Sequence, residues 1–228
     1  MPVIAAITIG QAPRDDTIAE LATLVPGARW VQAGALDGLD DAAIDALAPR
    51  SSTFPLVTRL RSGRTVVVGE DAIQAPVQAA IQRIEREADV VVILCSGTFT
   101  VSSRVPLIRP GLLLDATVRA LDLASLFVLT PLEGQVPAQE ARWRAFAPDV
   151  WVRCATPFAD TDFEALGREA RARDASAVVL DCMGYTLAMK AAVARGSGLP
   201  TILVRSLAAR VAAELLGIPG IDLLRTRN

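Results

Sequence analysis

The sequence predicts an α/β protein with two pseudo-symmetric lobes, each built on a mainly parallel sheet flanked by helices, with a cleft between the lobes. Short β-branched apolar runs alternate with stretches of helical periodicity, which is typical of βαβ units. The second half of the chain repeats the order of the first, and each half carries one cysteine at the end of a buried-type strand. The 228 residues are enough for two lobes of roughly 100 residues, each with its own core.

Eight strands are expected where continuous apolar runs are rich in β-branched residues. The strand at 125–130 corresponds in order to the one at 3–9, and the strand at 177–182 corresponds to the one at 89–95. The complete set of expected strands is 3–9, 29–33, 65–68, 89–95, 125–130, 149–154, 177–182 and 200–204.

Helical periodicity separates most of these strands, with apolar residues at a spacing of roughly 3.6. The expected helices are 73–87, 137–147, 161–173, 185–196 and 206–217.

The first lobe is expected to comprise residues 1–104 together with a C-terminal helical segment at about 206–228, and the second lobe residues 105–205. The stretch 104–124 would cross between them. The segment 51–64 is polar, basic and poorly periodic, so we expect a surface excursion, with a mobile loop over the cleft as the alternative.

Composition excludes several classes of protein. An apolar content of 52%, a charged content of 21% and a net charge of −2 are typical of a globular protein and argue against a nucleic-acid partner. The chain starts without a basic n-region, and no run reaches the ~18 apolar residues of a membrane span, so we expect no membrane partner and a cytoplasmic location. A homodimer is possible.

The chain contains no histidine, which removes the commonest general base and the commonest transition-metal ligand. Ser-His-Asp, Cys-His and His-Zn sites are therefore excluded. No pair of cysteines has Cys-x-x-Cys spacing, and no Walker loop or Gly-x-Gly-x-x-Gly motif follows the first strand. We expect neither a metal nor a cofactor.

Two cysteines lie in similar contexts. Cys95 ends the run Val-Val-Val-Ile-Leu, Cys182 ends Ala-Val-Val-Leu-Asp, and a glycine follows each thiol two residues later. Open α/β proteins bind ligands at the carboxyl ends of parallel strands, so both thiols are expected to flank one cavity as the catalytic pair. An inert role in the core is the alternative for both, and is the expectation for Cys154, which lacks the glycine turn.

A thiol is a useful carbon base because its unperturbed pKa of roughly 8.5 lies close to neutral pH, so that only modest tuning is required. Cys95 as thiolate would remove a proton from the α-carbon of a substrate, and Cys182 as thiol would return one to the opposite face. The roles would reverse for the other enantiomer.

The turn after each cysteine is expected to lead into a helix whose first amide groups bind an anion. The candidate substrate-binding residues lie in these turns and after the first strand of each lobe: Thr8, Gly10, Ser96, Gly97, Thr98, Glu133, Met183, Gly184, Tyr185 and Thr186. Arg14, Arg104 and Gln135 are further candidates for contact with a ligand, with a solvated surface position as the alternative. The charge of Asp181, if close, would oppose formation of the Cys182 thiolate.

At these residues the chain resembles the AroM family, a branch of the aspartate/glutamate/hydantoin racemase superfamily. The resemblance rests on the segments 6–14, 94–99, 131–135, 180–185 and 210–215. It implies two pseudo-symmetric lobes around a cleft, with Cys95 and Cys182 as opposed acid and base. Amino-acid racemases of the superfamily usually carry Asn-Thr after the first cysteine and Thr after the second, whereas Ser96 and Met183 occupy the following positions here.

Three functions follow as hypotheses. The first is a cofactor-independent two-cysteine racemase or epimerase that acts on an amino acid, a hydantoin or a related small carboxylate. The second is a single-cysteine isomerase or decarboxylase of a small carboxylate. The third is a non-catalytic small-molecule-binding accessory protein of AroM type.

Overall fold

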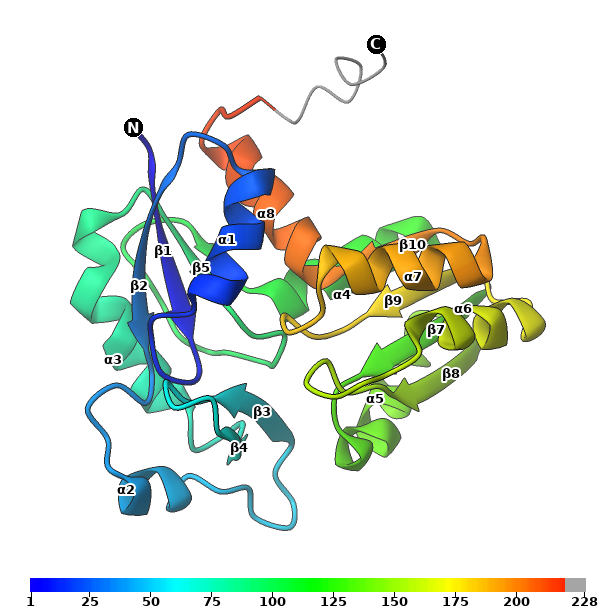
Figure 1. The fold of residues 1–228 in the computed structure, drawn as a ribbon, viewed down its shortest axis with the longest axis horizontal. Coiled ribbons are helices and arrows are strands. Elements are labelled where there is room, and N and C mark those ends of the chain that lie inside the picture. The colour runs from blue at the N-terminus through cyan, green and yellow to red at the C-terminus, as the bar shows by residue number, and fades with distance from the viewer. Residues whose placement is uncertain (220–228) are drawn as a thin grey trace.

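Two four-stranded parallel sheets form the centres of two lobes in the computed structural model, which describes residues 1–219 (Figure 1). The first sheet has the order β2-β1-β5-β6, with β1 at Val3–Thr8, β2 at Arg29–Gly34, β5 at Val90–Ile93 and β6 at Leu107–Ile108. The second has the order β10-β9-β7-β8, with β7 at Ser125–Thr130, β8 at Asp149–Cys154, β9 at Ala177–Leu180 and β10 at Thr201–Leu203. All strand pairs in both sheets are parallel, and the predicted fold class is confirmed.

The two sheets have equivalent strand positions. In each, the first strand of the lobe (β1 or β7) pairs on one side with the second strand (β2 or β8) and on the other with the strand that precedes a cysteine (β5 or β9). Strands β5 and β9 are buried along their whole length, which explains their continuous apolar sequences. The predicted repeat is therefore present in the topology.

Helices cover both faces of each sheet. In the first lobe, α3 (Gln74–Ile84) packs on one face, while α1 (Asp15–Leu24) and α8 (Val204–Leu215) pack on the other. In the second lobe, α4 (Pro110–Leu121) and α5 (Val136–Trp143) cover one face, and α6 (Phe163–Ala172) and α7 (Leu187–Ser197) cover the other. The remaining helical elements are the short helix α2 at Asp41–Asp45 and two 3₁₀ turns, η1 at Glu85–Glu87 and η2 at Glu133–Gln135. No helix within residues 1–219 combines the length and apolarity required to cross a membrane.

Helix α8 returns the chain from the second lobe to the first (Figure 1). Its alanines, among them Ala208 and Ala212, pack against Ile4 and Val90 of the first sheet. This contact supports the part of the proposed division that joins the segment at about 206–228 to the first lobe, although residues 220–228 lie outside the described range. The predicted boundary between residues 104 and 105 was placed too early, because β6 pairs with β5 in the first sheet.

The prediction for the segment 51–64 was wrong. It contains β3 (Pro55–Arg59), which pairs antiparallel with β4 (Thr65–Gly69) to form a hairpin beside the first sheet (Figure 1). Burial alternates along β3, with Leu56 and Thr58 inward, as expected for a strand with one solvated face. The stretch 104–124 is likewise more than a connection, because it contains β6 and α4. Helix α1 was also not predicted.

Helices α6 and α7 approach closely through Gly167 and Gly196. An added Cβ at Gly196 would lie 2.1 Å from the carbonyl oxygen of Glu164, and one at Gly167 would lie 2.4 Å from that of Val193. We expect Gly196→Ala to lower the free energy of unfolding by about 1–3 kcal/mol because the helices must separate, which outweighs the ~1 kcal/mol that alanine gains in helix propensity. Urea denaturation measures this change.

Gly134→Ala is the matched control, because its added Cβ would meet only Pro55 Cγ, at 3.8 Å. This substitution should change the free energy of unfolding by less than about 0.5 kcal/mol. Equal stability of the two variants would contradict the close helix contact.

Candidate active site

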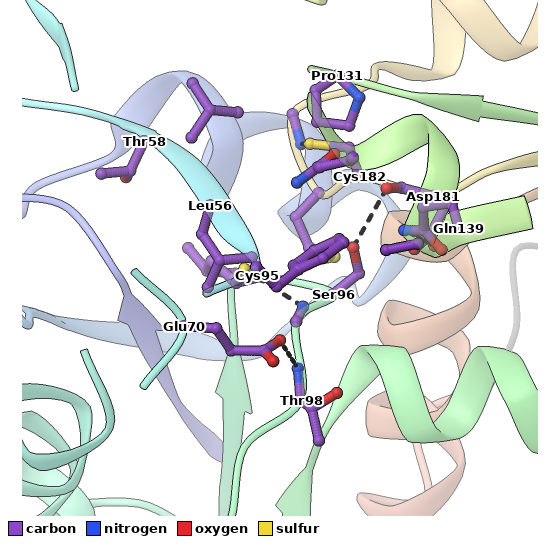
Figure 2. A pocket seen from close by; sticks show the side chains of 18 of the residues that line it. Leu56, Thr58, Glu70, Cys95, Ser96, Thr98, Pro131, Gln139, Asp181 and Cys182 are labelled. Atoms are coloured by element: carbon purple, nitrogen blue, oxygen red, sulfur yellow. Dashed lines mark hydrogen bonds between the residues drawn. The ribbon is translucent and has the colours of Figure 1, made fainter. Parts of the chain in front are cut away.

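A cavity of about 180 Å³ is lined by residues of both lobes at the carboxyl ends of their sheets. The first lobe contributes the turn that begins at Cys95, and the second contributes Asp181 and Cys182 (Figure 2). The hairpin closes a third side with Leu56 and Thr58 of β3. Both thiols thus face the same enclosed space.

The two thiols have the same local geometry. Each cysteine lies two residues beyond the end of its strand, β5 or β9. The backbone N–H of Gly97 donates to Sγ of Cys95 at 3.4 Å, and that of Gly184 donates to Sγ of Cys182 at 3.3 Å. A side chain at Gly97 would be crowded, because an added Cβ would lie 3.0 Å from Leu56 and 3.1 Å from Glu70. The repeated Cys-x-Gly sequence therefore gives each sulfur one N–H donor.

The segments that follow the two turns differ. After Cys182, helix α7 begins at Leu187, and Thr186 caps it by accepting a hydrogen bond from the N–H of Met189 at 3.2 Å. No helix follows Cys95 directly, so that prediction was wrong. Instead, the start of α4 packs on this turn from elsewhere in the chain: an added Cβ at Gly111 would lie 2.3 Å from the carbonyl oxygen of Ser96.

Hydrogen bonds across the lobes hold the two turns together. Oγ of Ser96 donates to the carbonyl oxygen of Asp181 at 3.2 Å (Figure 2). On the hairpin side, Nε2 of Gln135 donates to the carbonyl oxygen of Pro55 at 2.6 Å. These bonds bring segments 80 and 85 residues apart in the sequence to one cavity.

Burial raises the pKa of both cavity thiols. It raises the pKa of Cys182 to about 11; the charge of Asp181 adds to this rise, while the Gly184 N–H and the nearby charges of Arg205 and Arg14 oppose it. The pKa of Cys95 is raised further by burial, with added repulsion from Cys182, Glu70 and Asp181. Both thiols are therefore protonated at neutral pH in the free protein. The expectation that only modest tuning is required was wrong.

Two carboxyl groups line the cavity close to Cys95. Glu70, which directly follows β4, accepts a hydrogen bond from the N–H of Thr98 at 2.6 Å, and burial raises its pKa (Figure 2). The side chain of Asp181 is fully buried, and burial raises its pKa although Arg142 donates to it at 2.7 Å. Glu70 was not predicted as a site residue, because only the pairing of the hairpin brings it here.

The structure places several predicted residues on the cavity and others away from it. The predicted residues that line it are Cys95, Ser96, Gly97, Thr98, Cys182, Met183 and Gly184. Arg14 and Gln135 also line it, whereas Arg104 forms an ion pair with Glu85 elsewhere.

The other predicted residues have structural contacts instead of cavity contacts. Oγ1 of Thr8 accepts a hydrogen bond from the N–H of Gly10, and Gly10 in turn abuts the carbonyl oxygen of Arg59. The hydroxyl of Tyr185 donates to the carbonyl oxygen of Ala155 at 2.6 Å, and Thr186 is the cap of α7.

Glu133 lies beside Cys154. Burial and the neighbouring Glu133 carboxylate raise the pKa of Cys154. Substrate contacts of Thr8, Gly10, Glu133, Tyr185 and Thr186 stay predictions that no cavity contact supports. Among residues 1–219, no group of three or more cysteine, aspartate or glutamate side chains is placed to hold a metal ion.

Comparison with known protein families gives one match, described as AroM protein, over residues 4–216. The chain belongs to the AroM family. No curated protein matches this AroM-family chain.

Solved structures with the same fold belong to enzymes of several kinds. Allantoin racemase from Pseudomonas fluorescens is 17% identical, with a TM-score of 0.63 over 97% of this chain and 94% of that one. Maleate cis-trans isomerase from Nocardia farcinica is 15% identical, with a TM-score of 0.61 over 96% and 94%. Unliganded arylmalonate decarboxylase is 17% identical, with a TM-score of 0.58 over 96% and 94%. The AroM-family chain thus shares the fold of the racemase superfamily.

The unequal environments of the two thiols predict unequal reactivity. At pH 10, iodoacetamide should alkylate Cys182 at least about tenfold faster than Cys95, because the thiolate is the reactive form and one pKa unit changes its population tenfold. Peptide mass spectrometry over a pH series follows each cysteine separately, Cys154 included. Faster labelling of Cys95 at every pH would contradict the assigned electrostatics.

Proposed function

We propose that this protein is a cofactor-independent racemase or epimerase that moves a proton at the α-carbon of a small carboxylate. One observation carries the proposal: two thiols with matching backbone donors line one cavity from the ends of equivalent strands. Two acid–base groups on opposite sides of a bound carbon are what inversion of a stereocentre requires.

The proton transfer uses each thiol once. The thiolate of one cysteine takes the α-proton, so that the C–H bond breaks, an S–H bond forms and the electron pair stays on the substrate as an enolate. The S–H of the other cysteine then gives its proton to the opposite face and becomes the thiolate. The configuration inverts, and the reverse reaction restores the starting protonation states.

Cys182 is the proposed first base because it is the more easily ionised thiol. With a pKa of about 11, forming its thiolate at pH 7 costs about 5 kcal/mol. The N–H of Gly184 and the charges of Arg14 and Arg205 lower this pKa and so keep the cost from being higher. Cys95, held protonated by burial beside Glu70, is suited to be the proton donor in the same turnover.

A single-thiol reaction is the second candidate. Cys95 is the more strongly protonated thiol and lies beside a second carboxyl group, Glu70, which fits a proton donor that acts alone. The shared fold of arylmalonate decarboxylase and maleate cis-trans isomerase supports this alternative.

Hydrogen exchange in D₂O tests the proposal. Single enantiomers of amino acids, hydantoins and 2-substituted carboxylates are incubated with the protein, and NMR follows deuterium at the α-carbon. We expect Cys95→Ser and Cys182→Ser each to lower racemisation by about 10²–10⁴-fold, because each removes one acid–base group. Each variant should retain exchange with only one enantiomer.

Cys154→Ser is the matched control, since Cys154 does not line the cavity. It should leave exchange unchanged. Exchange of both enantiomers that persists in Cys95→Ser and in Cys182→Ser would refute the two-thiol mechanism. Loss of activity in Cys95→Ser alone would favour the single-thiol reaction.

A further inference from the structure

The charged groups of the cavity limit what kind of carboxylate fits it. Arg14 and Arg142 are its cations, and Glu70 and Asp181 are its carboxyl groups. A bound carboxylate will lie next to a donor that is not already used by the protein.

The donors of Arg142 are already used by the protein. Its Nε donates to Asp115 at 3.0 Å, its Nη1 to Gln139 at 3.0 Å and to Asp181 at 2.7 Å, and its Nη2 to Asp115. Two carboxylates thus balance its single positive charge. Arg142 fixes Asp181 and has little attraction left for a substrate anion.

Three backbone donors of the cysteine turns are also occupied. The N–H of Thr98 donates to Glu70, and the N–H groups of Gly97 and Gly184 donate to the sulfurs. Glu70 therefore occupies the place on the first turn at which a substrate carboxylate was expected. A substrate anion there would also be repelled by the Glu70 carboxylate.

Arg14 differs from Arg142 in its unused hydrogen-bond donor and in the number of carboxylates that balance its charge. Its Nε and Nη2 donate to Asp16 at 3.0 Å, its Nη2 also donates to Oγ1 of Thr17 at 3.4 Å, and no residue among 1–219 accepts a hydrogen bond from its Nη1. The side chain of Arg14 is only 15% exposed, whereas that of Asp16 is 57% exposed. A guanidinium whose Nη1 is unused, next to a solvated partner, can donate to a second carboxylate at the cavity.

Backbone contacts fix the position of Arg14. Its N–H donates to Oε1 of Gln32 at 2.6 Å, at the start of α1. The Gly-Gln-Ala-Pro-Arg motif therefore ends by presenting this guanidinium to the cavity, on the side of Cys182.

Much of the remaining wall is apolar. The hairpin side supplies Phe54, Leu56 and Val57, and the second lobe supplies Pro131 and Phe158. The rest of the lining is neutral and polar, such as Thr58, Gln135 and Gln139, or consists of the two protein carboxyl groups. A second carboxylate on the substrate would therefore meet no unused cation among the described lining residues. Burying an unpaired charge in this way is costly.

We infer that the cavity binds a small monocarboxylate with an apolar substituent and that Arg14 anchors its carboxylate. This inference rests on the proposed function for the site, and it names the class of substrate. Dicarboxylates such as aspartate are excluded by the same residues.

Two isosteric pairs of ligands test the inference. Leucine carries an isopropyl group where aspartate carries its side-chain carboxylate. The pair 4-methylpentanoate and succinate differs in the same way, and neither member has an amine. Calorimetry with the wild-type protein should show that, in at least one of the two pairs, the ligand with the isopropyl group binds at least tenfold more tightly than its dicarboxylate partner. Arg14→Gln should weaken that binding at least tenfold, and Arg14→Lys should have a smaller effect.

Arg144→Gln is the matched control, because Arg144 is exposed directly after α5 and pairs with Glu140 away from the cavity. It should leave binding unchanged, and circular dichroism checks that both glutamine variants are folded. Preference for the dicarboxylates, failure of both monocarboxylates to bind, or unchanged binding by a folded Arg14→Gln would each overturn the inference.

The α-proton exchange of leucine and aspartate, followed in the same samples, separates this inference from the proposed function. Binding of leucine through Arg14 without exchange would keep the substrate class and refute the two-thiol mechanism on it. Thiol-dependent exchange of aspartate alone would keep the mechanism and refute the substrate class.

Discussion

The turn that carries Cys182 belongs to the second lobe, but a charge pair between the buried Arg205 and the partly buried Glu20 attaches it to helices that pack on the first lobe. The guanidinium of Arg205 on α8 donates to the carbonyl oxygen of Met183 at 2.7 Å and to Glu20 of α1 at 2.8 Å. The other oxygen of Glu20 accepts the N–H of Leu187, at the start of α7. Removing one member of such a largely buried pair costs about 3–5 kcal/mol, because it leaves an uncompensated charge. The position of Cys182 opposite Cys95 depends on this attachment.

The same arrangement gives the two ends of the cavity, at Cys182 and at Cys95, different electrostatic environments. Arg14 and Arg205 lie on the side of Cys182 and favour its thiolate, whereas Glu70 lies on the side of Cys95 and opposes ionisation there. A pair of thiols in equivalent backbone settings thus acquires different acidities from the tertiary neighbours. In the proposed mechanism, this difference would assign Cys182 as the first base and Cys95 as the proton donor without a histidine.

The parallel sheets and the cysteine positions could be predicted from the sequence because they follow from local signals, namely β-branched runs that end in Cys-x-Gly. The hairpin could not be predicted in this way. Pro55 and the basic residues around it weaken the local strand signal of β3, which is stabilised by antiparallel pairing with β4. Glu70 was missed for the same reason. The high pKa of the thiols was also beyond the sequence, since burial of Cys95 and Cys182 results from the meeting of two lobes and a hairpin.

The central claim is that both thiols reach one substrate-sized space, and a short bifunctional thiol reagent tests it most directly. Dibromobimane is applied at about pH 10 to the Cys154→Ser protein, which leaves only Cys95 and Cys182, and digestion with mass spectrometry identifies the products. We predict an intramolecular bridge between Cys95 and Cys182 as the main product. Separate single adducts on the two cysteines, with no bridge, would contradict the account.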